Sequence, residues 1–275
     1  MSHIIAERLS ELQKKMAAQN IDLAIIPHAD PHQSEYQATH WHVREFFSGF
    51  SGSAGTLVVL RDGRAALWTD SRYFLQAALQ LDGTGIELMK EDIPGTPTIN
   101  EFIISNLSTG QTVGIDGMLF SINAANALQS ALTAHGISLN TTFFPAEGLW
   151  NDRPALPETP IFIHDTKYAG ESASDKISRV LSALPDGASS ILISALDAIA
   201  WTLNLRGTDV PCNPVFTAFL YLSPTGHTLL IDRKKITGEV ESYLRANNVA
   251  IQPYDSLMQF IASLPESERV LCDPA

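Results

Sequence analysis

The sequence predicts an α/β protein of two tandem domains with the same plan, each a mixed β-sheet flanked by helices. One hairpin pattern occurs twice, as LRDGRAALWTD at Leu60–Asp70 and as LSPTGHTLLID at Leu222–Asp232. In both, apolar runs flank a turn-forming group, Asp-Gly or Pro-Thr-Gly. An apolar strand precedes each hairpin, at Asp22–Pro27 and at Ser189–Ser194. A unit that returns after about 160 residues indicates two similarly folded domains in tandem.

Length and composition support two cores and limit the possible partners. The chain has 275 residues, more than the usual single domain, and 45% of them are hydrophobic. The formal net charge of −12 argues against nucleic acid or an anionic membrane as a partner, because both attract clustered Lys and Arg. The most apolar internal stretch, Ala188–Leu205, contains Asp197 and is too polar for a membrane span. Cys212 and Cys272 are too few for a metal set, and we expect a cytoplasmic protein with reduced thiols.

The first domain is expected to begin with a helix and to continue with alternating strands and helices. The amino terminus places Ile4, Ile5, Leu9, Leu12 and Met16 on one helical face, which predicts an amphipathic helix and not a signal peptide. Hairpins make antiparallel neighbours and helical crossovers make parallel ones, so the sheet should be mixed. The other expected elements are strands at 22–27, 86–90 and 112–116, the hairpin 56–69, and helices at 71–81, 98–107 and 122–135.

The second domain is expected to repeat this order after a linker. Three prolines within Arg153–Pro160 predict the linker. The first domain should therefore span residues 1–155 and the second residues 156–275. The elements expected in the second domain are helices at 174–184, 196–203, 238–247 and 256–264, strands at 189–194 and 269–272, and the second hairpin.

Four motifs follow one another along most of the chain. They read SGFSGSAGT from Ser48, WTDSRYFLQAA from Trp68, LWNDRP from Leu149 and ALDAIAWTLNLRGTDVPCNPVF from Ala195. In this order they resemble the long form of Xaa-Pro aminopeptidase, also called aminopeptidase P. The resemblance implies two creatinase N-terminal-like domains and a role in removing the first residue of a peptide whose second residue is proline.

The resemblance also implies what this sequence lacks. In the resembled family a carboxy-terminal pita-bread domain holds two metal ions, Mn²⁺ or Zn²⁺, through two Asp, one His and two Glu. The sequence contains no such ligand set, so the chain is expected to be the amino-terminal portion of a longer enzyme, without a catalytic or metal-binding residue and inactive alone. Its implied partners are a peptide substrate, its own catalytic domain and a second copy in a homodimer.

Two other functions remain open at this point. A creatinase-like amidinohydrolase or a prolidase belongs to the same superfamily. A catalytically dead scaffold for peptide binding or dimerisation would keep both domains without the metal ligands. The protein sequence beyond Ala275 would separate these alternatives, because a full set of two Asp, one His and two Glu supports a peptidase.

Arg72 is the candidate substrate-binding residue. Thr69 and Asp70 are good N-cap candidates for the helix expected from Ser71, and the cap would orient Arg72. A guanidinium group offers a rigid fork of donors that suits the carbonyls or the carboxylate of a peptide. In the resembled family, the arginine of this motif reaches toward the metal domain and helps to recognise substrate. The sequence departs from the family at Ser71, which is usually Gly, and at Ser51, which is usually Asp.

Two other groups of residues are interpreted as structural. Gly49, Gly52 and Gly55 lead into a strand, whereas a phosphate cradle leads into the first turn of a helix. His40 and His42 have no third metal ligand at a familiar spacing. We therefore expect a tight turn at the glycines and ordinary loop histidines.

The segment from Asn204 to Phe216 is also interpreted as structural. Arg206 and Asp209 are close enough in sequence to form a local ion pair that braces a loop, worth at most about 1 kcal/mol if exposed. A surface that faces the metal domain is the alternative interpretation of this segment.

Overall fold

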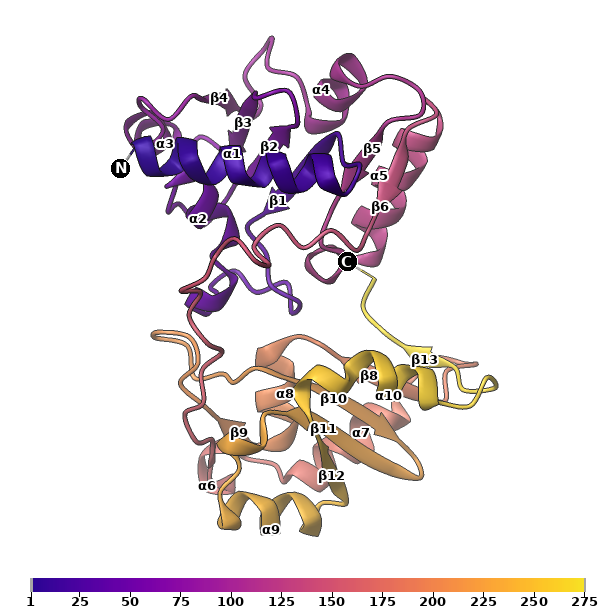
Figure 1. Ribbon diagram of the computed structural model, residues 1–275. Coiled ribbons are helices and arrows are strands. Elements are labelled where there is room, and N and C mark those ends of the chain that lie inside the picture. Colours follow the sequence, from indigo (N-terminus) through magenta and orange to yellow (C-terminus); the bar gives the residue numbers. More distant parts are fainter. Residues whose placement is uncertain (1, 275) are drawn as a thin grey trace. The chain divides into compact units, whose positions relative to one another are not determined.

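The structure, a computed structural model, describes residues 2–274 and divides into two compact units (Figure 1). Unit 1 comprises residues 2–155 and unit 2 comprises residues 156–274. Each unit contains one mixed β-sheet with helices on both faces. The predicted fold class, two tandem α/β domains of one plan, is therefore confirmed.

Unit 1 is built on a six-stranded sheet with the strand order β4-β3-β2-β1-β5-β6. Strands β1, β2 and β3 are antiparallel neighbours, and the other three pairs are parallel. The strands are β1 Leu23–Pro27, β2 Thr56–Leu60, β3 Ala65–Thr69, β4 Ile86–Lys90, β5 Thr112–Gly114 and β6 Ser138–Asn140. The helices are α1 Ser2–Ala18, α2 Val43–Ser48, α3 Phe74–Gln80, α4 Ile99–Asn106 and α5 Ile122–Thr133, with 3₁₀ turns η1 Thr39–Trp41 and η2 Gly117–Leu119.

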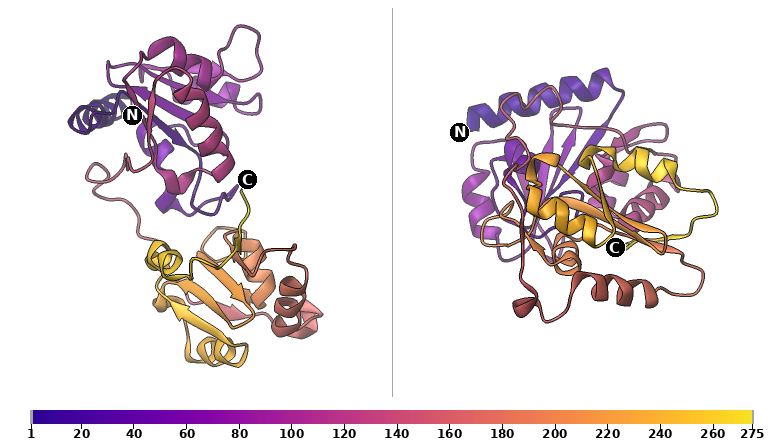
Figure 2. Two further views of the ribbon diagram at one scale, coloured as in Figure 1. Left: turned by 90° about the vertical axis from the view of Figure 1, so that its right-hand side faces the viewer. Right: turned by 90° about the horizontal axis from the view of Figure 1, so that it is seen from below.

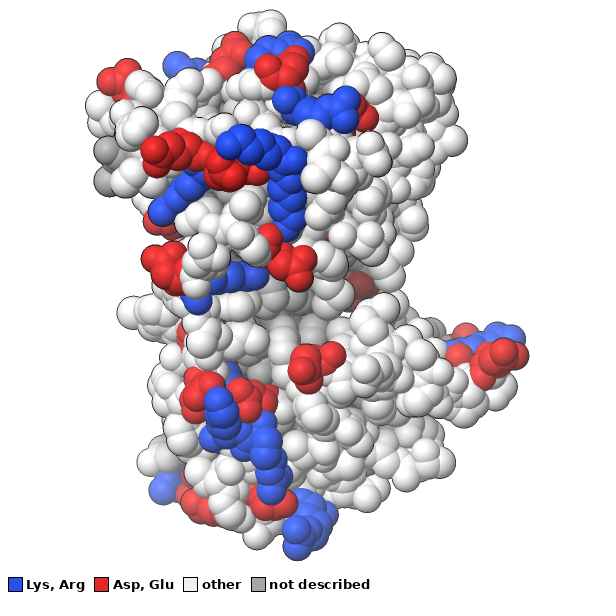
Figure 3. Space-filling view, viewed as in Figure 1, with Lys and Arg blue, Asp and Glu red and all other residues white. Residues whose placement is uncertain are grey.

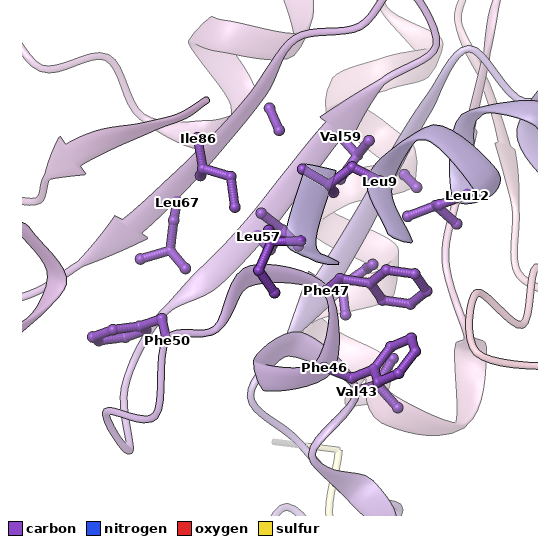
Figure 4. Close-up of a cluster of buried hydrophobic side chains, with 14 of the residues drawn as sticks. Leu9, Leu12, Val43, Phe46, Phe47, Phe50, Leu57, Val59, Leu67 and Ile86 are labelled. Carbon is purple, nitrogen blue, oxygen red and sulfur yellow. The ribbon is translucent and has the colours of Figure 1, made fainter. Parts of the chain in front are cut away.

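The two faces of this sheet are covered by different helices, as the left view of Figure 2 shows, with α1 in indigo on one side and α5 in magenta on the other. Helices α1, α2 and α3 cover one face with a buried cluster that includes Leu9, Phe47, Leu57 and Ala77 (Figure 4). Helices α4 and α5 cover the opposite face. The prediction for Ile4 is wrong, because Ile5, Leu9, Leu12 and Met16 turn toward the sheet while Ile4 is exposed.

Unit 2 is built on a five-stranded sheet with the strand order β12-β11-β10-β8-β13. A separate two-stranded ribbon joins β7 to β9. The strands are β7 Phe162–Ile163, β8 Ser190–Ile193, β9 Leu205–Arg206, β10 Ala218–Ser223, β11 Gly226–Ile231, β12 Val249–Gln252 and β13 Val270–Leu271. The helices are α6 Thr166–Ala169, α7 Ala173–Ser182, α8 Leu196–Leu203, α9 Gly238–Ala246 and α10 Leu257–Ser263, with 3₁₀ turns η3 Arg233–Lys235 and η4 Tyr254–Ser256.

The predicted repeat is present in the topology of both sheets. In unit 2, β8, β10, β11, β12 and β13 take the places of β1, β2, β3, β4 and β5, with the same parallel and antiparallel pairings. Helix α8 occupies the position of α2, and each ends at a residue in the left-handed conformation, Asn204 and Gly49. One structural plan is therefore used twice.

The register within the repeat differs from the sequence comparison by one residue. Val59 pairs with Ala65 in the first hairpin and encloses five residues, whereas Leu222 pairs with His227 in the second and encloses four, so the second turn is one residue shorter. By strand pairing, Val59 therefore corresponds to Leu222, and Leu60 corresponds to Ser223 and not to Leu222. Leu60 accordingly packs beneath α4 and α5, whereas Leu222 belongs to the cluster on the opposite face of its sheet.

The glycine segment of unit 1 is a close-packed loop around a buried arginine. Arg44 of α2 donates from Nη1 to the carbonyl of Gly55 at 3.2 Å and from Nη2 to the carbonyls of Phe50, at 3.3 Å, and Gly52. The guanidinium also lies over the ring of Phe50, 4.8 Å from its centroid. Burial lowers the pKa of Arg44 to about 10, so the side chain remains charged at neutral pH. The loop therefore solvates a buried cation with backbone carbonyls.

Gly52→Ala is expected to destabilise the protein by about 1–3 kcal/mol, because overpacking strains a close-packed site. A Cβ atom at Gly52 would lie 2.3 Å from Cζ of Phe50 and 2.7 Å from Cδ1 of Tyr73. Gly238→Ala is the matched control, because a Cβ atom there meets nothing within 4 Å and Gly238 begins a helix. Urea-induced unfolding of both variants checks the prediction, and equal midpoints would contradict it.

Candidate functional site

The candidate site lies at one edge of the six-stranded sheet of unit 1, called sheet 1 from here on. Strands β1, β3, β4 and β5 run in the same direction, so their carboxyl ends meet at this edge. His28, Asp70, Glu91 and Asp116 follow these strands in the sequence. The glycine loop reaches the same edge because it leads into the start of β2. Ligands of open α/β sheets bind outside the carboxyl ends of strands, so this edge is the candidate site of unit 1.

Arg72 lies in a turn between β3 and α3, at this edge. Its Nε donates to Oδ1 of Asp70 at 3.0 Å, and its Nη2 donates to Oδ2 at 2.8 Å. The Arg72 side chain is nevertheless 63% exposed. The pair with Asp70 does not use Nη1, which can therefore donate to an incoming carbonyl or carboxylate. Asp70 holds one side of the guanidinium fork and leaves the other side accessible.

The predicted helix cap is wrong. Asp70 orients the Arg72 side chain through a turn instead of through a cap. Helix α3 begins at Phe74, and its N-cap residue is Tyr73, which makes no side-chain cap. The Thr69 hydroxyl donates instead to the carbonyl of Ala54 at 2.7 Å. Oδ1 of Asp70 accepts the backbone N–H of Arg72 at 2.9 Å, which closes an Asx turn. Asp70 therefore orients Arg72 directly, and the helix starts three residues later than expected.

Tyr73 joins this turn to the glycine loop. Its hydroxyl lies 2.6 Å from the hydroxyl of Ser53, and its ring packs edge-on against Phe50. Ser71, where the resembled family usually has Gly, is exposed and does not have a positive φ. The turn therefore accepts a side chain at this position without backbone strain.

Ser51, the second departure from the resembled family, bonds to helix α3. Its hydroxyl accepts from the side-chain amides of Gln76, at 3.1 Å, and Gln80, at 2.9 Å. The Ser51 backbone N–H donates to Oε1 of Gln80 at 3.1 Å. Serine therefore connects the loop to α3 without a negative charge.

Charged groups of both signs surround Arg72. The hydrogen bond from Arg72 lowers the pKa of Asp70, and the same contact raises the pKa of Arg72. The carboxylate of Glu35, in the loop after β1, also raises the pKa of Arg72. Burial, followed by the charge of Asp70, raises the pKa of Glu91. The sequence predicted no role for Glu35.

His28 is a neutral group at this edge. Burial, reinforced by the positive charge of Arg44, lowers the pKa of His28 to about 4. The imidazole is therefore uncharged at neutral pH. Arg72 and Glu35 are exposed ionic groups.

The equivalent segment of unit 2 also forms an Asx turn, but a lysine stands at the position of Arg72. Oδ1 of Asp232 accepts the backbone N–H of Lys234 at 2.9 Å, as Asp70 does for Arg72. Lys234 is bonded to Glu158, and that contact raises the pKa of its amine. The repeat thus contains a lysine at the place of Arg72, engaged by the carboxylate of another segment.

The expected ion pair between Arg206 and Asp209 is absent. Asp209 pairs with Lys235, and both side chains are almost completely buried, at 0% and 1% exposed. Oδ2 of Asp209 also accepts the backbone N–H of Thr217 at 2.7 Å. Arg206 donates instead to the backbone carbonyls of Ala200 and Leu205. The partner of Asp209 comes from a turn 26 residues away, so sequence proximity was misleading.

The loop histidines of unit 1 have protein partners. Nδ1 of His40 lies 2.7 Å from the carbonyl of Pro154, and Nδ1 of His42 lies 3.1 Å from the carboxylate of Glu45. Arg153 donates from Nε to the carbonyl of His40 at 2.8 Å. The two contacts of His40 hold the last residues of unit 1 against η1.

Residues 2–274 contain neither a cluster of metal ligands nor a helix suited to a membrane. No three His, Cys, Asp or Glu side chains in that range gather as a set that could hold a metal ion. Cys212 and Cys272 are exposed free thiols. None of the helices within that range is long and apolar enough to cross a membrane. On the face that Figure 3 shows, Lys and Arg are interspersed with Asp and Glu, without a broad basic surface.

Comparison with known proteins assigns the family. Residues 8–151 match a family model described as the creatinase/prolidase N-terminal domain, and residues 152–275 match a second model with the same description. The chain belongs to the creatinase/prolidase N-terminal domain family. It contains two such domains in tandem, and the resemblance inferred from the four motifs is confirmed.

Proteins similar to this tandem pair are named aminopeptidase P2 or Xaa-Pro aminopeptidase P. The chain is 42% identical to aminopeptidase P2 of Arabidopsis thaliana, over 99% of the chain and 39% of that protein. It is 41% identical to a probable Xaa-Pro aminopeptidase P of Aspergillus niger, over 96% of the chain and 43% of that protein. The chain therefore spans about two fifths of the length of these relatives.

A solved structure extends the similarity to three dimensions. The X-prolyl aminopeptidase of Caenorhabditis elegans, described as a cytosolic enzyme with a di-nuclear active site, superposes with a TM-score of 0.88 at 29% identity. The match covers 95% of this chain and 44% of the C. elegans chain. Both creatinase/prolidase N-terminal domains are therefore found together in a known aminopeptidase structure.

Proposed function

We propose that this chain is the non-catalytic amino-terminal portion of a Xaa-Pro aminopeptidase, which hydrolyses the bond between the first residue of a peptide and a proline in second position. The observation that carries the proposal is the match of nearly the whole chain, at 41–42% identity, to proteins with that name. Within the complete enzyme, these two domains shape the substrate cleft, limit the length of the peptide and support a homodimer in the cytoplasm.

Arg72 is the residue of this chain that we propose to contact the substrate. Asp70 holds Nε and Nη2, so the guanidinium is fixed before a peptide arrives. A fixed donor loses less conformational entropy on binding than a mobile one. Glu35 adds an exposed carboxylate whose charge raises the pKa of Arg72. A peptide offers carbonyl and carboxylate acceptors for Arg72, and an amino terminus that a carboxylate can attract.

The metal chemistry is assigned to a carboxy-terminal catalytic domain. Two divalent ions, Mn²⁺ or Zn²⁺, would supply an activated water there. Such a pair of ions needs several carboxylates close together, and residues 2–274 contain no set of that kind. The residues of this chain would bind and orient the peptide and would not ligate the ions.

The 275-residue chain is expected to show no peptidase activity and to retain no stoichiometric metal. Peptides of the Arg-Pro-Pro type, incubated with the chain and added Mn²⁺, test the first expectation, and metal analysis after dialysis tests the second. The full-length protein from the same gene, assayed in parallel, should release the first residue. Turnover by the 275-residue chain would contradict the assignment, and an inactive full-length protein would favour the scaffold alternative.

A further inference from the structure

The carboxyl ends of β11 and β12 border a pocket in unit 2. Its volume is about 560 Å³, within the range of about 300–1,000 Å³ that small-molecule sites occupy. The two strands are parallel neighbours, and they take the places of β3 and β4 in the repeat. The pocket therefore lies at the edge of its sheet that corresponds to the Arg72 edge of sheet 1, where ligands of open α/β sheets bind.

The pocket combines apolar walls with two carboxylates. The apolar residues come from the two strand ends, from the segment around η4 and from the start of unit 2, and they are Leu156, Ile231, Ile251, Pro253 and Tyr254. The ring of Tyr254 is held in place by stacking on Phe219, at 5.3 Å between centroids. The carboxylates are those of Asp232 and Asp255. An apolar cavity with a few polar groups is the usual form of a small-molecule site.

Both basic residues of the lining already have acidic partners. Lys235 pairs with Asp209, and neither side chain is more than 1% exposed. Nη2 of Arg233 lies 2.7 Å from Oε1 of Glu241, which does not line the pocket. By contrast, no salt bridge within residues 2–274 uses either carboxylate of the lining. The unpaired charge of the pocket is therefore negative.

The repeat explains why one of these carboxylates has no cation. Asp232 corresponds to Asp70, and Oδ1 of each closes an Asx turn onto the residue two positions later. In unit 1 that residue is Arg72, which also donates to Asp70 from Nε and Nη2. In unit 2 it is Lys234, whose amine bonds to Glu158 instead. Asp232 thus keeps the turn but lacks the side-chain donors that Asp70 receives.

We propose that this pocket binds a small ligand that carries an ammonium group on an apolar body. The ammonium would take, at Asp232, the place that the guanidinium takes at Asp70, and Asp255 would add to the attraction. The apolar body would lie against the walls of the pocket. A free amine and the amino terminus of a peptide with an apolar first residue share this chemistry.

An NMR titration of the 275-residue chain with 2-phenylethylamine tests the preference for a cation. The amine should bind saturably and shift the backbone signals of residues that line the pocket. Phenylacetate and 2-phenylethanol keep the aromatic ring without the ammonium, and they should bind roughly 10-fold more weakly because they lose a charge-assisted hydrogen bond. Equal affinity for the three compounds, or shifts confined to other residues, would overturn the proposal.

Substitutions separate contact with the ligand from the structure of the turn. In Asp232→Asn, an amide oxygen still accepts the N–H of Lys234, so the variant should fold and should bind the amine roughly 10-fold more weakly. Glu266→Gln is the matched control, because it removes one negative charge from an exposed residue outside the pocket and should leave the affinity unchanged. Gln252→Trp, at an exposed residue of the lining, should abolish binding by filling the cavity. Wild-type affinity in both pocket variants, with thermal melts showing that they fold, would contradict the proposal.

Two peptides distinguish the sources of the ammonium group. Phe-Ala-Ala should bind as the amine does if the natural ligand is the amino terminus of a peptide, and its N-acetylated form should not bind. Binding of the amine without binding of Phe-Ala-Ala identifies a free amine as the ligand class.

The titration with 2-phenylethylamine is repeated on the full-length protein, as wild type and as Asp232→Asn. Loss of binding in the longer wild-type protein, or equal binding by wild type and variant, would refute the proposal. The readout does not depend on peptidase activity, and the pocket belongs to unit 2 whereas Arg72 belongs to unit 1. An inactive full-length protein that still binds the amine through Asp232 would refute the proposed function alone.

Discussion

Arg72→Ala in the full-length enzyme should lower kcat/KM for Xaa-Pro peptides by roughly 10- to 150-fold, because a charge-assisted hydrogen bond to the substrate is lost. Arg72 is exposed, and its salt bridge with Asp70 is a surface pair, so the substitution should leave the melting temperature nearly unchanged. Arg72→Lys should recover only part of the activity, because a single ammonium cannot both hold Asp70 through two bonds and present a donor to the peptide.

The repeat supplies a matched control for this experiment. Lys234 occupies the equivalent turn of unit 2, also carries a positive charge and is also exposed. Lys234→Ala should leave kcat/KM unchanged if the effect of Arg72→Ala comes from contact with the substrate. Wild-type kcat/KM in Arg72→Ala, or equal losses in both variants, would show that Arg72 is not a substrate-binding residue. Steady-state kinetics with thermal melts decide between these results.

Lys235→Met should destabilise the protein by about 3–5 kcal/mol, because it leaves the carboxylate of Asp209 buried without its counter-charge. Burial lowers the pKa of Lys235, while the hydrogen bond from its amine to Asp209 opposes that shift. Both groups have lost their hydration. Removing one of them therefore leaves the other buried and unpaired, and this cost is the main contribution of the pair to stability. Urea-induced unfolding measures the change in free energy.

The neighbouring lysine provides the control for this prediction. Lys234→Met removes an exposed ammonium one residue away and should shift the unfolding midpoint only slightly. Adding Asp209→Asn to Lys235→Met should restore part of the lost stability, because it removes the unpaired charge and keeps an acceptor for the N–H of Thr217. A Lys235→Met variant as stable as Lys234→Met would mean that water reaches Asp209.

Elements with strong local signals could be predicted from the sequence. The predicted helix 196–203 agrees with α8, because its apolar spacing lies within one segment. The capping box of Thr98 and Glu101 begins α4 one residue after the predicted start, again through neighbours in sequence. The repeated strands and hairpins identified two domains of one plan for the same reason.

Predictions that depended on a particular partner were less successful. Asp70 and Thr69 satisfy the composition of a helix cap, but Asp70 closes a turn onto Arg72 and Thr69 bonds to the glycine loop. The register of the two hairpins differs by one residue because the length of each turn decides which face a side chain joins. Neither the hydrogen-bond partners of Asp70 and Thr69 nor the turn lengths of the hairpins follow from the residue types of the strands alone.

The sequence by itself determined the family and the tandem repeat, because these follow from motif order and local periodicity. The linker at 153–160 and the role of Arg72 stay predictions. Only the tertiary structure decided how charges are used. It buried Arg44 among carbonyls and paired Asp209 with Lys235. The physical reason is that the energy of a charge depends on its burial and its partners, and both are set by segments that are distant in sequence.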